Sequence, residues 1–374
     1  AGQYIGRKDE KSACKAATQL VWFVSLSAVA IMILVYFGKD IILNQVFGHI
    51  TAEVKGHADI YLLIVTASIP FIALYNGGAA IFRAMGNSQV SMRVSLLMNA
   101  INVTGNAILV FGLRIGTAGV AIPTLISRMV AAIVITVLLC NQTRILHIER
   151  TLKIRFDGRM IRKILAIGVP NGLENSMFQL GKILVLSLVT SFGTASIAAN
   201  AVSNNIAMFA VLPGMSIGFA MLTVSAQCVG AGDFEQVKYY TKKLMKLTYI
   251  CLILMNILVV LLLPFIIKVY GLSAEASEYA RRILIYHSCC VVTIWPLSFS
   301  LANTLRAAAD VKYTMILAIV SMWTFRIGFS YILGSYLKWG VFGIWVAMTI
   351  DWLFRSICFT IRYLGGKWKH ASLV

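Results

Sequence analysis

Two acidic residues, Glu174 and Asp351, stand well inside long apolar stretches of this sequence, whereas the other carboxylates lie at the ends of such stretches or between them. A carboxylate in an apolar segment is costly unless it is protonated, paired with a cation or bound to an ion. We therefore expect Glu174 to bind an ion or the cationic group of a substrate. Asp351 and Arg355 are four residues apart, and this spacing predicts an ion pair within one helix.

The residues around Glu174 form a polar stripe. At 100° per residue, one face roughly 100° wide holds the stripe, which consists of Asn171, Glu174, Asn175, Phe178 and Lys182. Glu174 lies about eleven residues beyond the cytoplasmic start of its stretch at 163, or roughly 16 Å of helical rise, which is half the thickness of a bilayer core. We expect the stripe to face a hydrated cavity and to bind ion or substrate. The alternative is a structural carboxyl group, hydrogen-bonded between helices.

Four further polar residues in apolar stretches allow two interpretations. Asn200, Asn204 and Asn303 offer amide groups that could line the binding site, although asparagine also joins membrane helices by hydrogen bonds. Arg326 could contact substrate or bond to a neighbouring helix. Lys182 lies eight residues from Glu174, about 12 Å along a helix, so we expect it to reach the outer surface or another helix rather than Glu174.

No arrangement typical of an enzyme is found. The sequence has no paired carboxylates at helical spacing, no Ser/His set and no phosphate-binding loop, and neither its five histidines nor its seven cysteines show metal-ligand spacing. We predict that the protein is not an enzyme and that it has no metal or organic cofactor.

Composition indicates a membrane protein. Of 374 residues, 59% are hydrophobic and 13% are charged, against about 25% charged residues in soluble domains; the mean hydropathy is +0.83. These values exclude a water-soluble globule. The net charge of +19, from 33 basic and 14 acidic residues, is explained by basic loops on the cytoplasmic side, and no nucleic-acid motif is present.

Apolar stretches predict ten membrane-spanning helices. Barrel strands would alternate in hydrophobicity, and these stretches do not. The connection at 142–163 is rich in Arg and Lys, including Arg150, Lys153 and Arg155, whereas the next connection is uncharged. Both termini are therefore predicted to be cytoplasmic. The stretches are 18–37, 58–82, 89–112, 116–141, 163–191, 195–229, 244–270, 280–305, 312–336 and 340–363.

Sequence similarity between the halves indicates a duplication. Gln3 to Asp9 matches Gln227 to Asp233 at a shift of 224, Arg83 matches Arg306 at 223, and Gly116 matches Gly340 at 224. We predict two parallel repeats that form an N-terminal lobe at 1–150 and a C-terminal lobe at 151–374. The second repeat begins with two spans that have no partner in the first, so twelve spans are expected for a complete protein, with two missing before residue 1.

Several motifs resemble those of the multidrug and toxic compound extrusion (MATE) transporters. They are Gly168-Val-Pro-Asn-Gly-Leu-Glu174, Gln227-Cys-Val-Gly-Ala-Gly-Asp233, Leu305-Arg-Ala-Ala-Ala-Asp310, Trp323-Thr-Phe-Arg326, and Phe82-Arg-Ala-Met-Gly86 with Asn99, Asn102 and Asn106 downstream. The resemblance covers residues 1–366 and implies an all-α, two-lobed bundle that exports cationic or amphipathic drugs in exchange for Na⁺ or H⁺ by alternating access. Many members place their acidic residue one turn beyond Glu174, where this chain has Phe178 and Gln179.

Two functions are weighed from these residues. The first is an antiporter in the cell membrane, monomeric, with small organic cations or amphipathic drugs and membrane lipids as partners. The second is a flippase for lipid-linked saccharides, which would need a strongly cationic interior. We expect the interior to be balanced instead, with Glu174 and Asp351 against Lys182 and Arg326, which favours the antiporter.

Overall fold

The computed structural model describes residues 1–41, 43, 52–148 and 156–370. Within these ranges every regular element is helical and no strand occurs, which confirms the predicted all-α class. Four residues singled out in the sequence, His49, Arg150, Lys153 and Arg155, lie outside the described residues. So does the expected lobe boundary between residues 150 and 151, which stays a prediction.

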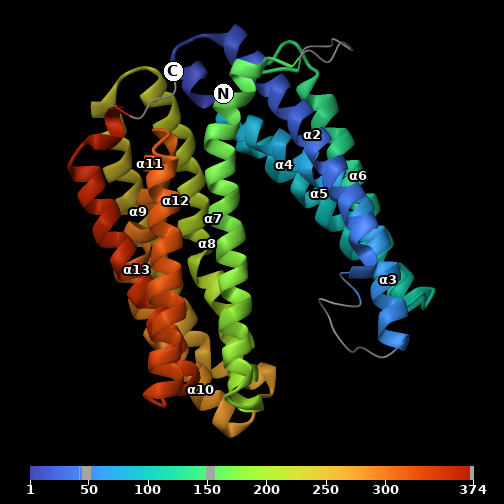
Figure 1. The fold of residues 1–374 in the computed structure, drawn as a ribbon, viewed down its shortest axis with the longest axis vertical. Helices are drawn as coiled ribbons and strands as arrows, with labels where there is room; N and C mark the ends of the chain where they lie inside the picture. The colour runs from blue at the N-terminus through green and yellow to red at the C-terminus, as the bar shows by residue number, and fades with distance from the viewer. Residues whose placement is uncertain (42, 44–51, 149–155, 371–374) are drawn as a thin grey trace. The chain divides into compact units, whose positions relative to one another are not determined.

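The chain divides into two compact units, Ala1–Ile164 and Leu165–Val374. Figure 1 shows the first unit in blue to teal and the long helix α7 in green. Helix α7 (Gly158–Thr190) begins in the first unit and continues into the second. The other helices of the first unit are α1 (Gly2–Gly6), α2 (Glu10–Ile41), α3 (Ala52–Ala67), α4 (Ile69–Ala84), α5 (Ser88–Asn106), the π-helical η2 (Ala107–Gly112) and α6 (Ala118–Leu139).

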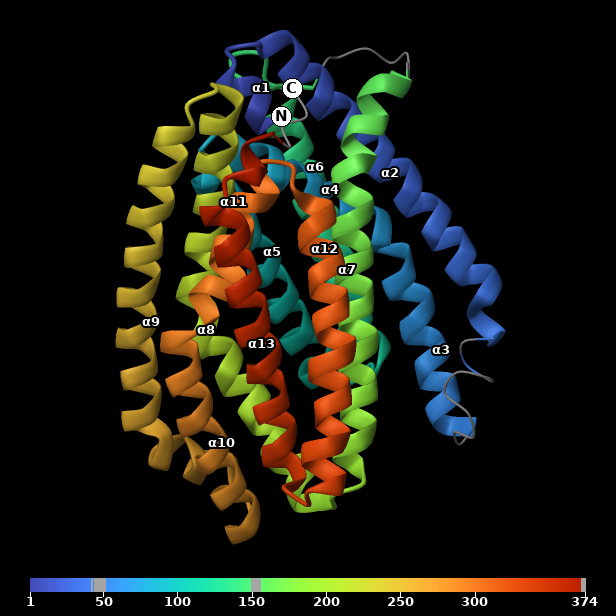
Figure 2. The same ribbon diagram turned by 60° about the vertical axis from the view of Figure 1, so that its left-hand side comes forward.

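The second unit is a bundle of long helices that run alongside one another (Figure 2). Its buried core includes the large side chains of Met221, Leu252, Trp295, Trp345 and Trp352. After α7 it comprises α8 (Thr194–Gly230), α9 (Phe234–Tyr270), α10 (Ala274–Thr293), η3 (Pro296–Ser300), α11 (Leu301–Ala307), α12 (Val311–Ser321), η4 (Met322–Gly328), η5 (Ser330–Tyr336), α13 (Gly340–Leu364) and the short η6 (Lys367–His370).

In the described part of the chain, seven helices are long and apolar enough to cross a membrane, or up to nine if each of two bent pairs is one span. Helix α7, with 33 residues, is long enough, but it is not among them because polar residues such as Asn171, Glu174 and Lys182 interrupt its apolar sequence. The predicted count of ten therefore stays a prediction, while the multispan helical class is confirmed.

A proline lies at the start of the second helix in each bent pair. The α3–α4 pair bends by 41° and the α10–η3 pair by 56°. Pro70 occupies the first turn of α4, and Pro296 begins η3. Proline lacks an amide hydrogen and its ring clashes with the preceding turn, so the helix axis must change direction there.

The predicted duplication is visible in the backbone. Residues with a left-handed conformation are uncommon outside glycine, yet they recur here at nearly one shift. The pairs, with their φ angles, are Lys8 (59°) and Gly232 (76°), Gly86 (78°) and Ala309 (68°), Arg114 (53°) and Lys338 (58°), and Gly116 (66°) and Gly340 (60°). Their separations, 224, 223, 224 and 224, reproduce the shift found in the sequence.

Close helix packing repeats in the same way. A Cβ at Gly119 would lie 3.2 Å from the carbonyl of Leu109, and a Cβ at Gly343 would lie 2.8 Å from the carbonyl of Leu333. Gly119 and Gly343 are 224 residues apart in the sequence, and so are Leu109 and Leu333. The π-helical segments η2 and η5, which contain Leu109 and Leu333, occupy equivalent places. Each unit thus contains the same local packing, which confirms the internal repeat.

Asp157 caps helix α7 and links it to α2. Its Oδ1 accepts hydrogen bonds from the backbone N–H groups of Arg159 (2.9 Å) and Met160 (3.2 Å), which have no partner inside the helix. Its Oδ2 lies 2.5 Å from Lys15 Nζ, and its own N–H donates to Gln19 Oε1. The hydrogen bond from Lys15, together with those from the backbone, lowers the pKa of Asp157.

We predict that the Asp157→Asn variant has a melting temperature a few degrees lower than the parent at neutral pH. Because the pKa of Asp157 is lowered on folding, its stabilising effect is complete above the unfolded-state pKa of about 4 and is lost as the pH falls through the folded-state value. The difference in melting temperature between parent and variant should thus persist from pH 7 to about 5 and shrink in stronger acid. An equal difference at all pH values would contradict this assignment.

Candidate functional site

Glu174 is the central residue of α7, sixteen residues from each end (174 − 158 and 190 − 174). Its Oε1 lies 2.6 Å from Nη2 of Arg306, which follows the bend between α10 and η3. The two side chains are 14% and 23% exposed. An ion pair with so little solvent contact is screened weakly and is held by a charge-assisted hydrogen bond.

A neighbouring amide orients Arg306. The guanidinium Nη1 of Arg306 donates to Oδ1 of Asn303 at 3.3 Å, one turn earlier in α11. Asn303 in turn packs on Gly218 of α8, where a Cβ would lie 2.6 Å from its amide nitrogen. The contact between α8 and α11 thus fixes Asn303, and Asn303 directs Arg306 toward α7.

The second carboxylate oxygen of Glu174 has no protein partner. Oε2 is buried and forms no hydrogen bond. A buried acceptor without a partner costs about 1–3 kcal/mol. A proton or a cation bound at Oε2 would remove this cost, so Glu174 has one oxygen committed to the protein and one available to an ion.

Among the described residues, no hydrogen bond or ion pair joins Glu174 to the rest of the predicted stripe. Asn175 donates a hydrogen bond to the carbonyl of Asn171 within the helix. Lys182 is exposed, and its Nζ lies 4.9 Å from the ring centroid of Phe178, one turn earlier in α7; its expected reach toward the outer surface or another helix stays a prediction. Arg326 of η4 contacts the same ring, with Cζ at 5.0 Å. Phe178 therefore meets two cations.

Asp351 and Arg355 form the ion pair that their spacing predicts. Arg355 donates to both carboxylate oxygens of Asp351, at 2.9 and 2.7 Å, and Ser321 also donates to that carboxylate. Their side chains are 0% and 5% exposed. The expected charge balance of Glu174 and Asp351 against Lys182 and Arg326 is wrong, because Arg306 and Arg355 already neutralise the two acids.

The predicted asparagines separate into different environments. Asn200 is buried and accepts a hydrogen bond from Trp345 Nε1 of α13 at 3.1 Å, so it joins two helices. Asn204 donates to the carbonyl of Asn200 within α8. Only Asn303 lies in the network of Glu174. A binding role for Asn200 and Asn204 stays a prediction.

Sequence reasoning missed Arg306 as the partner of Glu174, although Arg306 appeared as a repeat position. It also missed polar contacts in the first unit. Asn102 donates to Thr124 at 3.0 Å, Asn106 donates to Asn102 at 3.1 Å, and Oδ1 of Asn106 is buried without a partner. On α6, Arg128 donates to Ser68 at the α3–α4 bend. Arg128 is a charged residue inside the apolar stretch 116–141, and this feature of the sequence could have indicated its polar contact.

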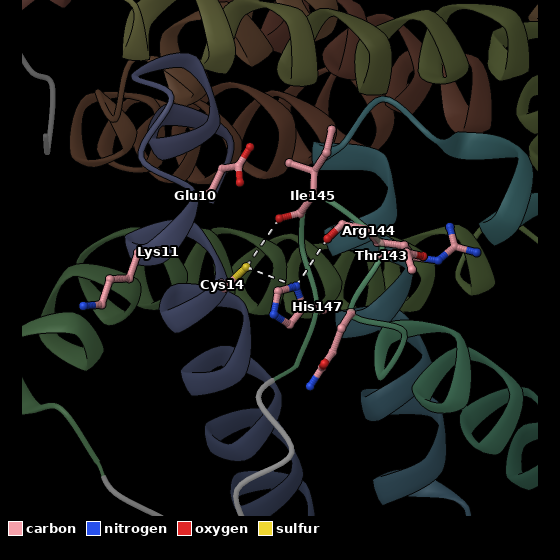
Figure 3. Close-up of a pocket in the computed structure, with 8 residues that line it drawn as sticks. Glu10, Lys11, Cys14, Thr143, Arg144, Ile145 and His147 are labelled. Atoms are coloured by element: carbon pink, nitrogen blue, oxygen red, sulfur yellow. Dashed lines mark hydrogen bonds between the residues drawn. The ribbon is translucent and has the colours of Figure 1, made fainter.

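A cavity of about 410 Å³ lies at one end of the first unit and is lined by residues of α2 and of the segment after α6 (Figure 3). There the Cys14 thiol donates to the carbonyl of Ile145 at 3.4 Å and lies 3.7 Å from Nδ1 of His147. His147 also contacts the carbonyl of Arg144. These contacts attach the segment to α2, and Cys14 is 5% exposed.

A second cavity, of about 600 Å³, lies in the other unit and is lined by residues of the α7–α8 connection, α8, α10 and the start of α13, with Arg282, Lys338 and Trp339 in its wall. Neither cavity contains Glu174. No group of three or more His, Cys, Asp or Glu side chains that could hold a metal ion occurs among the described residues.

These features define a multispan helical membrane transporter, since a carboxylate in the middle of a membrane-length helix is typical of ion-coupled transport. Comparison with protein families specifies the class further. The family model described as MatE matches residues 1–108 and 170–332. The chain belongs to the MatE family, the multidrug and toxic compound extrusion transporters, as its motifs predict.

Known relatives agree with this assignment. The chain is 26% identical to the uncharacterized transporter YisQ of Bacillus subtilis, over 98% of this chain and 80% of that protein. It is 21% identical to the probable multidrug resistance protein NorM of Thermotoga maritima, over 96% and 78%. An outward-facing structure of a multidrug resistance MATE family transporter superimposes with a TM-score of 0.89, covering 97% of this chain and 82% of the other at 20% identity.

We predict that Glu174 and Arg306 are energetically coupled. In a double-mutant cycle of Glu174→Gln, Arg306→Met and the double variant, the coupling free energy should be about 1–3 kcal/mol, because either single change leaves a buried charged or polar group without its partner. Thermal unfolding in detergent measures it. As a control, the exposed pair Glu278 and Arg281 should give a coupling below about 1 kcal/mol. Additive effects at 174 and 306 would contradict the ion pair.

Proposed function

We propose that this protein is a secondary antiporter that exports amphipathic and cationic drugs across the cell membrane in exchange for Na⁺ or H⁺. The observation that carries the proposal is Glu174, whose Oε1 is bound to Arg306 and whose buried Oε2 is free. A multidrug role is supported by the names of relatives such as the NorM proteins. Those names favour drug export over flipping of lipid-linked saccharides.

Ion binding at Glu174 would act on the helix contacts around it. A proton or Na⁺ at the carboxylate withdraws negative charge from Oε1 and weakens its attraction to Arg306. Arg306 lies in α11, which is joined to α10 through the 56° break at η3. Loosening this contact would allow α7 and α11 to repack, which is the kind of two-state element that alternating access requires.

The proposed energy source follows from the chemistry of the Glu174 carboxylate. A carboxylate neutralised by a proton or by Na⁺ releases Arg306 in either case, so both ions remain in the proposal. Both termini are proposed to lie in the cytoplasm, because Lys and Arg collect in the connections assigned to that side. The protein is further proposed to act as a monomer.

The Glu174→Gln variant should lose ion-driven export. Glutamine keeps the shape and hydrogen-bonding capacity of the protonated acid but can neither release a proton nor bind Na⁺ by charge. In proteoliposomes, ethidium transport driven by a Na⁺ or a pH gradient should fall to the level of protein-free liposomes. The gradient that drives the parent identifies the coupling ion.

The matched control is Glu278→Gln, the same substitution in a surface ion pair with Arg281, which should retain parental transport. Export by Glu174→Gln at the parental rate would refute the role of Glu174.

A further inference from the structure

The intramembrane charges of the second unit do not cancel. Within α7, the continuous run α12–η4–η5 and α13, the charged residues away from the ends are the acids Glu174 and Asp351 and the cations Lys182, Arg326 and Arg355, and Arg306 reaches Glu174 from the last turn of α11. Arg306 pairs with Glu174, and Arg355 pairs with Asp351. Subtracting the pairs leaves two positive charges, those of Lys182 and Arg326.

Both unpaired cations lie on one aromatic ring. Lys182 Nζ is 4.9 Å and Arg326 Cζ is 5.0 Å from the centroid of Phe178. Among the described residues neither cation has a hydrogen bond or an ion pair with a carboxylate. The carboxylate of Asp351 attracts Arg326 electrostatically, but its hydrogen bonds come from Arg355 and Ser321. Cation–π contacts of this kind are worth about 0.5–2 kcal/mol each, too little to replace a counter-ion.

Helix packing fixes the two cations near each other. At Gly181, next to Lys182, α7 approaches η4 so closely that a Cβ would lie 2.2 Å from Cε of the buried Met322. Arg326 follows Met322 by four residues, one turn of the π-helical segment η4. Both views show α7 and α12, which η4 continues, side by side (Figures 1 and 2).

We propose that Phe178, Lys182 and Arg326 form an anion-binding site for the carboxylate or sulfonate of an amphipathic aromatic compound. The two donors supply positive charge, and the ring supplies an apolar surface on which an aromatic ligand packs. Two charges suit one monovalent acid group. The inference rests on the proposed function, because it names the residues that would recognise an acid group on an exported compound.

Two dyes that differ in one group test the site. Rhodamine 110 carries a free carboxylate, and rhodamine 123 is its methyl ester. Binding to the purified full chain in lipid nanodiscs is measured by fluorescence polarisation, without any ion gradient. We expect rhodamine 110 to bind about tenfold more tightly than rhodamine 123. This preference should disappear in Lys182→Gln and in Arg326→Gln.

Two control variants accompany these. Lys182→Arg keeps the charge and should keep the preference. Lys268→Gln removes a lysine near the end of α9 and should leave binding of both dyes unchanged. Thermal melting of each variant reports folding, and the comparison of the two dyes on the parent protein needs no variant.

Equal affinities of the parent for the two dyes, no binding of rhodamine 110, or a preference that survives Lys182→Gln and Arg326→Gln would overturn the proposal. Since binding is measured without transport, a loss of coupled export alone would refute the antiporter and leave the anion site standing. Loss of the dye preference with coupled export intact would refute only the anion site.

Discussion

The cost of an uncompensated charge in hydrocarbon governs how the polar residues of this protein are arranged. Each central acid of the second unit is bound by an arginine, Glu174 by Arg306 and Asp351 by Arg355. The two ion pairs differ in whether every carboxylate oxygen already has a hydrogen-bond partner. Asp351 has both oxygens bonded and is fully buried, whereas Glu174 keeps one oxygen without a partner. The free oxygen of Glu174 is the feature on which the proposed ion binding depends.

The position of that ion pair depends on the broken helix α10–η3–α11. Pro296 forces the bend, and the bend precedes the turn that carries Asn303 and Arg306. The first unit repeats the break at Pro70, followed by Arg83 at the position equivalent to Arg306. The duplicated scaffold thus provides a bent helix followed by an arginine in each half.

Much of this could be predicted from sequence. The apolar stretches gave the helical membrane class, the shift of 224 gave the duplication, and the spacing of Asp351 and Arg355 gave their pair, because all three depend on local periodicity. The partner of Glu174 could not be found in this way, since Arg306 is 132 residues away and only the fold brings them together. Lys182 and Phe178 have helical spacing in α7, but the second cation on that ring, Arg326, comes from η4 and could not be found from the periodicity of α7.

The central claim is that Glu174 exchanges a protein partner for an ion. Infrared difference spectroscopy of the protein in lipid, recorded on adding Na⁺ or lowering the pH, observes this directly. The account predicts a change in carboxylate absorption that is absent from the spectrum of a chain with glutamine at position 174. Identical ion-induced spectra from the two proteins would show that another group takes up the ion and would contradict the account.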